Sequence, residues 1–172
     1  LRVPRVYLNR GNDAQGVWLG FLFDDPLRID DMALGWQGVH RFCSVSAGDV
    51  DNDGDQDLYF GDYEQGGARA LDINDRLLLN DGTGYFSDQS GARMTATMLE
   101  SSFAMSTAIV DMNLDGKLDI LKDDALNAPQ GVSISYNNGA GGPGWFGTYV
   151  VAHSFAPYHL AVGDLNNDGL PD

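Results

Sequence analysis

Short apolar runs alternate with turns rich in Gly, Asn and Asp along most of the chain. Two of these runs, DLYFGD (57–62) and LDILKD (118–123), follow or overlap acidic segments, and three more run into Asn and Gly: RVYLNRG (5–11), RLLLNDG (76–82) and SISYNNG (133–139). Runs of this length that end in such turns are typical of β-strands joined by tight turns. The pattern predicts an all-β protein of antiparallel strands.

One stretch departs from this pattern. Residues 92–115 contain neither Gly nor Pro, and Met94, Met98 and Leu99 have a spacing that is compatible with a helix. A short helix near 93–100 is one interpretation. The Ser-rich and β-branched continuation, residues 101–110, favours a strand instead.

Internal repetition organises the chain. An acidic nine-residue segment occurs three times, at 49–57, 111–119 and 164–172, each time after a short run of small and apolar residues. The predicted order within a unit is strand, acidic loop, strand, variable loop, strand, turn, strand. The predicted units are the end of a preceding repeat plus an insertion (1–39), a first repeat (40–100), a second repeat (101–155) and the start of a third (156–172).

The acidic segments share one arrangement of oxygen-bearing side chains. Positions 1, 3, 5 and 9 carry Asp or Asn and position 6 is always Gly. The side chains are Asp49, Asp51, Asp53 and Asp57 in the first segment, Asp111, Asn113, Asp115 and Asp119 in the second, and Asp164, Asn166, Asp168 and Asp172 in the third. Ca²⁺ takes six to eight oxygen ligands, and a tightly wound loop with alternating carboxylates supplies them.

The backbone carbonyl at position 7, from Asp55, Lys117 and Leu170, is the remaining predicted ligand. Its role depends on no particular side chain, which explains why the residue type varies there. Three segments therefore predict up to three Ca²⁺ ions.

Other metal-binding loops fit less well. An EF-hand requires a bidentate Glu at position 12, but that position is Phe60 in the first segment and Lys122 in the second. Mg²⁺ prefers a rigid octahedron and keeps its waters, and Zn²⁺ prefers His and Cys ligands, for which the three His residues are not suitably spaced.

Charge supports a structural role for the metal. The net charge is −15, and 11 of the 25 acidic residues lie in the three segments, where they repel one another without a cation. Cys43 is the single cysteine, so no intramolecular disulfide is possible, and metal is one option for stabilising the fold in its place. With only ten Lys and Arg and no basic patch, nucleic acid is not an expected partner. No apolar run is long enough to span a membrane.

These segments resemble the FG-GAP/VCBS repeat family, whose members include the calcium-loop repeats of integrin α-subunit heads. The resemblance lies in AVGDLNNDGLPD (161–172) and in AGDVDNDGDQDLYFGD (47–62) followed by DRLLLNDGTGYF (75–86). It implies β-propeller-like blades of four strands, with Ca²⁺ in a loop that links two strands of one blade. A closed propeller of this kind has about seven blades, so about three repeats imply a partial propeller or one that assembles with other chains.

The resemblance also implies a function. We expect a calcium-stabilised structural or adhesive module at the cell surface or outside the cell, as a subunit of a larger surface assembly or filament. Its partners would be protein or glycan ligands at the cell surface, or further copies of itself.

Two alternatives remain. One is a carbohydrate-binding module that stacks sugars on exposed aromatic side chains; the candidates are Trp18, Trp36, Tyr85, Trp145 and Tyr158. The other is an accessory domain of a secreted enzyme. The chain itself is not expected to be an enzyme, because no nucleophile or base is paired with His40, His153 or His159 at a suggestive spacing.

Overall fold

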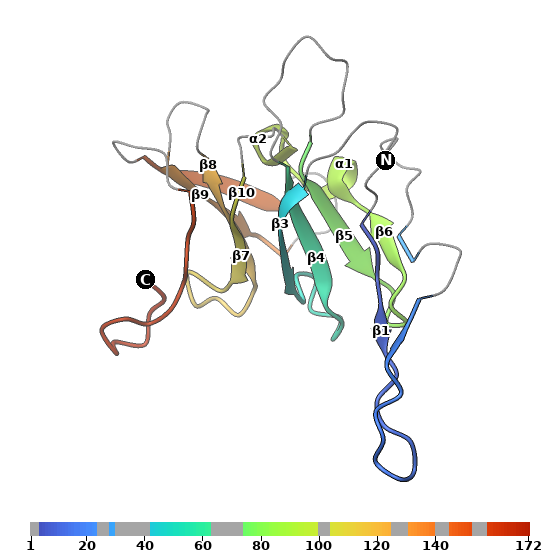
Figure 1. Ribbon diagram of the computed structural model, residues 1–172. Helices are drawn as coiled ribbons and strands as arrows, with labels where there is room; N and C mark the ends of the chain where they lie inside the picture. The colour runs from blue at the N-terminus through green and yellow to red at the C-terminus, as the bar shows by residue number, and fades with distance from the viewer. Residues whose placement is uncertain are drawn as a thin grey trace.

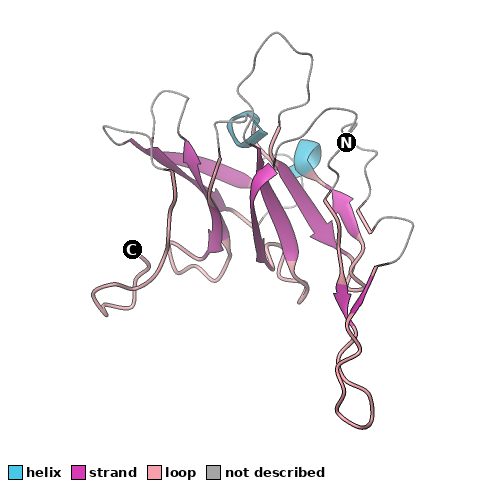
Figure 2. Cartoon of the chain, viewed as in Figure 1, coloured by secondary structure: helices cyan, strands magenta, loops and turns pink. Residues whose placement is uncertain are grey.

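The computed structural model describes residues 4–23, 28–29, 42–62, 74–99, 104–124, 131–139, 145–152 and 158–172. Within these ranges the protein is all-β, with two four-stranded antiparallel sheets, a two-stranded hairpin and two helical turns (Figures 1 and 2). The described strands do not close into a barrel. The predicted fold class, antiparallel blades of an all-β repeat protein, is confirmed.

Each four-stranded sheet is a simple meander. The first contains β3 (Phe42–Gly48), β4 (Asp57–Asp62), β5 (Arg76–Asn80) and β6 (Phe86–Asp88), paired in chain order. The second contains β7 (Thr107–Val110), β8 (Asp119–Asp124), β9 (Gly131–Asn137) and β10 (Phe146–Ala152), again paired in chain order. We call these sheets blade 1 and blade 2. In both, the acidic segment joins the first strand to the second.

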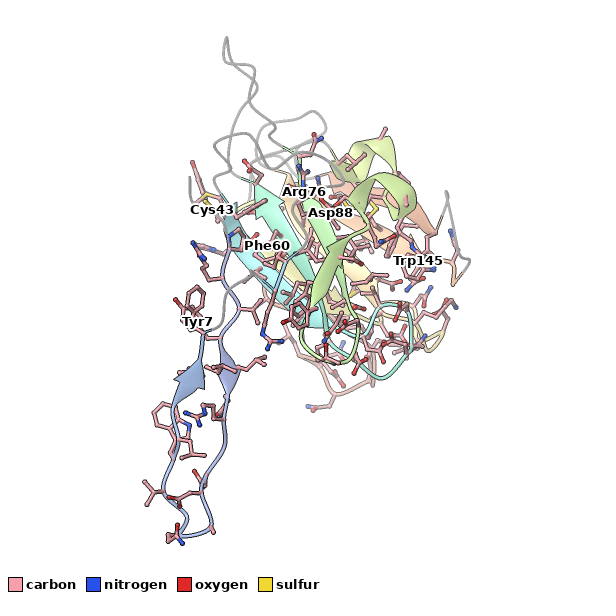
Figure 3. The ribbon with its side chains drawn as sticks, turned by 90° about the vertical axis from the view of Figure 1, so that its right-hand side faces the viewer. Tyr7, Cys43, Phe60, Arg76, Asp88 and Trp145 are labelled. Atoms are coloured by element: carbon pink, nitrogen blue, oxygen red, sulfur yellow. The ribbon has the colours of Figure 1, made fainter. Side chains whose placement is uncertain are left out.

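A hairpin arm, residues 8–22, extends away from the two blades (Figures 1 and 3). Its base is the pairing of β1 (Leu8–Asn9) with β2 (Phe21–Leu22), and backbone hydrogen bonds continue the ladder as far as Asp13 N to Val17 O. The side chains of Trp18 and Phe21 are 55% and 60% exposed and pack edge to face against each other. The arm thus presents aromatic surface to solvent.

The ambiguous stretch after β6 contains both predicted kinds of structure. Two helical turns, α1 (Ser90–Arg93) and α2 (Ala96–Leu99), precede β7, and residues 101–103 lie outside the described ranges. Met94 and Met98 are buried in the core between the blades. Their burial explains the helix-compatible spacing, while the β-branched residues further along form β7.

The main core lies between the two blades. Blade 1 contributes Tyr59, Leu77 and Leu79, together with Val50 from its acidic loop, and blade 2 contributes Ile120, Trp145 and Phe146. Gly48 permits close approach here, since a Cβ at this position would lie 2.5 Å from Ile109 Cγ2 of blade 2. Burying these apolar faces against each other holds the blades together.

A buried ion pair also crosses between the blades. Lys122 Nζ of β8 lies 2.9 Å from Asp75 Oδ2, directly before β5, and the two side chains are 5% and 0% exposed. Asp75 also accepts hydrogen bonds from Tyr59 Oη and from the backbone N–H of Asp62. This network fixes the relative position of the blades, because neither charge has water as an alternative partner.

Candidate metal sites

The three acidic segments form loops at the same end of the molecule, the lower end in Figure 1. The first connects β3 to β4 and the second connects β7 to β8. The third, 164–172, follows residues 158–163, which form no strand in the described structure. We call them loops 1, 2 and 3.

Loop 1 is wound around the carboxylate at its first position. Asp49 Oδ1 accepts a hydrogen bond from Asp53 N at 3.0 Å, and Asp49 Oδ2 accepts one from Gly54 N at 2.9 Å. The tight path requires positive φ at Asn52 (59°) and at Gly54 (99°). Asn tolerates this region better than most residues and Gly occupies it without strain, which explains the recurring Gly.

Loops 2 and 3 repeat this winding. Asp111 accepts hydrogen bonds from Asp115 N and Gly116 N at 3.1 and 2.8 Å, and Asp164 accepts them from Asp168 N and Gly169 N at the same distances. Position 4 has positive φ in both, at Leu114 and Asn167. The sequence repeat is therefore also a repeat of backbone geometry.

The carboxylate at position 9 ties each of the first two loops to its blade. Asp57 accepts hydrogen bonds from Val50 N and from Asn80 N, the last residue of β5, each at 2.9 Å. Asp119 likewise accepts them from Met112 N and from Asn137 N at the end of β9. Both carboxylates are fully buried.

Asn80 and Asn137 are site residues that the sequence reasoning missed. The Asn137 side chain also donates to Leu118 O in loop 2 of the same blade. At 2.7 Å it donates to Val50 O in loop 1 of the other blade. The signal was present, because an Asn ends the apolar run in RLLLN and SISYN. On its own this pattern indicates only the start of a turn.

Loop 3 differs from the other two in the exposure of its position-9 carboxylate. Its position-9 carboxylate, Asp172, accepts a hydrogen bond from Leu165 N at 2.9 Å, as in the other loops. However, Asp172 is exposed, as are Asp164, Asn166 and Asp168. The same loop winding thus forms without a blade around it in the described structure.

Loop 1 brings carboxylates close enough to share a cation. Asp49, Asp51 and Asp57 each offer an oxygen, and these oxygens lie within 4.8 Å of one another. Asp51 Oδ1 is buried and has no hydrogen-bond partner in the described structure. A buried, unpaired carboxylate oxygen among other carboxylates fits a hard cation such as Ca²⁺, which takes oxygen ligands. Position 9 thus joins positions 1 and 3 in one cluster, whereas Asp53 and Asp55 lie outside it.

The pKa values of the loop carboxyl groups also favour a bound cation. Burial, with the nearby Asp51 and Asp53 charges adding to it, raises the pKa of Asp57 to about 6 despite its hydrogen bonds from Asn80 and Val50. Burial also raises the pKa values of Asp51 and Asp119. The ion-free loops therefore hold negative charge at a cost that a bound cation would relieve.

Loop 2 differs from loop 1 in carrying a positive side chain. Lys117 Nζ lies 2.7 Å from Asp115 Oδ2, and its hydrogen bond lowers the pKa of that carboxyl group. Loop 1 has Asp55 in the equivalent place.

Among the described residues, the aromatic candidates belong to separate segments of the chain and differ in exposure. Trp145 is only 3% exposed and lies beneath the Arg93 guanidinium, 4.3 Å from its ring centroid, so it offers no face for a sugar. Arg28 lies over the ring of Tyr85, although this residue remains 41% exposed. Trp18 and Tyr158 are exposed but belong to separate segments, whereas Trp36, His40 and His153 lie outside the described residues.

None of the helices in the described ranges has the length and apolar character needed to cross a membrane. No curated protein and no solved structure matches the chain. Residues 49–121, which run from the start of loop 1 through loop 2 into β8, match the family model of the FG-GAP-like repeat. This segment, less than half of the chain, is therefore similar to FG-GAP-like repeats, which are β-propeller-like modules typical of extracellular proteins.

Proposed function

We propose that the protein is a calcium-stabilised structural and adhesive module that works outside the cell. The observation that carries this proposal is the recurrence of one hydrogen-bonded acidic loop, with three carboxylates within 4.8 Å of one another in loop 1. The FG-GAP-like repeat over residues 49–121 supports the extracellular setting.

In loop 1 the ligands would be the side chains of Asp49, Asp51, Asp53 and Asp57 and the backbone carbonyl of Asp55. Loop 2 would use the equivalent atoms of Asp111, Asn113, Asp115, Lys117 and Asp119, and loop 3 those of Asp164, Asn166, Asp168, Leu170 and Asp172. A bound Ca²⁺ supplies two positive charges and no chemistry of its own.

The loop residues link the bound charge to the strands of each blade. Asp57 binds loop 1 to β5 through Asn80 N, and Asp119 binds loop 2 to β9 through Asn137 N. Holding these carboxylates ionised and in place therefore fixes the first three strands of each blade. Extracellular calcium modules have Kd values of about 10⁻⁴–10⁻³ M, which suits a calcium-rich medium.

Two surface features support the adhesive role. The hairpin arm exposes Trp18 and Phe21, and the outer face of blade 1 carries an apolar cavity of about 320 Å³ whose lining includes Val45, Phe60 and Phe86. Exposed apolar side chains such as those of Trp18, Phe21 and Val45 are typical of protein contact sites. They suit protein ligands or self-association.

Calcium is expected to stabilise and assemble the protein. Adding 1–5 mM Ca²⁺ to chelator-treated protein at pH 7.5 should raise Tm by about 5–15 °C, because Ca²⁺ binds the folded loops and not the unfolded chain. Mg²⁺ at the same concentration should have a much smaller effect. Light scattering on the same samples should show association in Ca²⁺.

Two results would argue against the proposal. A Tm that is equal in Ca²⁺ and in chelator removes the calcium role. A chain that stays monomeric in Ca²⁺ removes the self-association part, and association that Trp18→Ala and Phe21→Ala leave unchanged removes the role of the arm. Both results leave the stabilisation intact.

A further inference from the structure

The side chain at position 7 distinguishes the two loops that lie within blades. In loop 2 it is Lys117, whose ammonium group lies 2.7 Å from Asp115 Oδ2. Asp115 occupies position 5, one of the predicted calcium ligands. In loop 1 position 7 is Asp55, so the same place carries a negative charge.

The position-7 side chain lies over a turn glycine of its own blade. A Cβ at Gly139, in the turn after β9, would lie 2.7 Å from Lys117 Cδ and 3.2 Å from its Cε. In blade 1 a Cβ at Gly82 would lie 2.6 Å from Asp55 Oδ2. Both glycines have positive φ, and both leave room for the side chain above them. The Lys117 stem therefore lies against the blade with its ammonium group directed at loop 2.

The formal charges of the loops differ accordingly. Residues 49–57 contain five acids and no base, which gives −5, whereas residues 111–119 contain three acids and one Lys, which gives −2. Hard cations bind more tightly where more ligand charge is available. The charge difference therefore favours binding of Ca²⁺ to loop 1 over binding to loop 2.

We propose that Lys117 is a tethered cation that competes with Ca²⁺ for Asp115, so that loop 1 fills at a lower calcium concentration than loop 2. The inference rests on the proposed calcium function. Lys117 then sets the calcium concentration at which loop 2 fills. Blade 1 is stabilised first as the calcium concentration rises.

The expected difference in Kd between the two loops follows from the exposure of the Lys117–Asp115 pair. The side chains of Lys117 and Asp115 are 27% and 35% exposed, and an ion pair this exposed changes an equilibrium by only a few fold. A Ca²⁺ ion held at Asp115 would also repel the ammonium group, which adds to this even with solvent screening. Together they separate the two loops by about tenfold in Kd.

The test follows each loop by the amide of its position-6 glycine in a ¹⁵N–¹H NMR calcium titration of the full chain. Gly54 N donates to Asp49 and Gly116 N donates to Asp111, so each signal reports its own loop. In the wild-type protein the Gly54 midpoint is expected about tenfold below the Gly116 midpoint.

Two reciprocal variants isolate position 7. Lys117→Met keeps the stem over Gly139 and removes the charge, and it should lower the Gly116 midpoint about tenfold while the Gly54 midpoint stays unchanged. Asp55→Lys places the same cation over Gly82 and should raise the Gly54 midpoint at least tenfold without moving that of Gly116. A dispersed spectrum shows that each variant is folded.

The outcomes separate this inference from the proposed function. If both glycines titrate but the Gly116 midpoint in Lys117→Met stays within twofold of the wild-type value, Lys117 is not a competitor and the inference is wrong, although calcium binding stands. If neither glycine responds to millimolar Ca²⁺, the proposed calcium function fails and the inference fails with it.

Discussion

Replacing Lys122 by Met is expected to lower the free energy of unfolding by about 3–5 kcal/mol, because it leaves the Asp75 carboxylate buried without its ammonium partner. Lys122 Nζ and Asp75 Oδ2 are 2.9 Å apart, and neither side chain is more than 5% exposed. The wild-type network therefore stabilises the contact between the blades only while both charges are present. Denaturant unfolding at pH 7.5 measures the loss.

Three controls make this prediction specific. Lys117→Met is the same substitution at a partly exposed pair, and it should leave the free energy of unfolding close to the wild-type value. Adding Asp75→Asn to Lys122→Met should restore part of the loss, because no buried charge is left. Burial raises the pKa of Asp75, so the single variant should recover stability as the pH falls and this group takes up a proton. A loss below 1 kcal/mol for Lys122→Met would show that the pair does not hold the blades together.

The ion-free protein is expected to become more stable as the pH falls from 7.5 to about 5. Burial raises the pKa of Asp57 to about 6, well above its value in the unfolded chain, so folding favours the protonated form. The stability from this proton is complete below the unfolded pKa and is lost as the pH rises through about 6. The shift corresponds to about 2–3 kcal/mol, and Asp51 and Asp119 shift in the same direction.

Calcium should invert this dependence, because Ca²⁺ binds the ionised carboxylates and competes with protons. Melts in chelator and in 5 mM Ca²⁺ between pH 5 and 7.5 give the comparison. Asp57→Asn, which cannot titrate at this position, should flatten the slope in chelator. Stability in chelator that rises steadily with pH, unaffected by Asp57→Asn, would contradict the account of this carboxylate.

Most of the fold can be predicted from the sequence, because it follows from local patterns. The strands β4, β5, β8 and β9 lie where apolar runs meet turns, because the alternation of strand and turn depends on neighbouring residues. The positions of the acidic loops followed from Gly and Asp spacing for the same reason. The sequence left residues 92–115 ambiguous, since the burial of Met94 and Met98 between two blades is a property of packing.

What the sequence could not indicate are contacts between distant segments. Asn80 and Asn137 reach the position-9 carboxylates only after β5 and β9 are paired beside the loops. The pair between Lys122 and Asp75 joins residues 47 positions apart on different blades. The sequence leaves Trp145 open to sugar stacking or core packing, and only the tertiary structure, which buries it in the core beneath Arg93, decides for the core.

Calorimetric titration of Ca²⁺ into chelator-treated protein at pH 7.5 tests the central claim most directly. We expect saturable binding in the range of about 10⁻⁴–10⁻³ M, with one equivalent lost in Asp51→Ala, which removes a loop-1 ligand whose Oδ1 has no other partner in the described structure. No binding at millimolar Ca²⁺, or binding that Asp51→Ala leaves unchanged, would contradict the assignment of these loops as calcium sites.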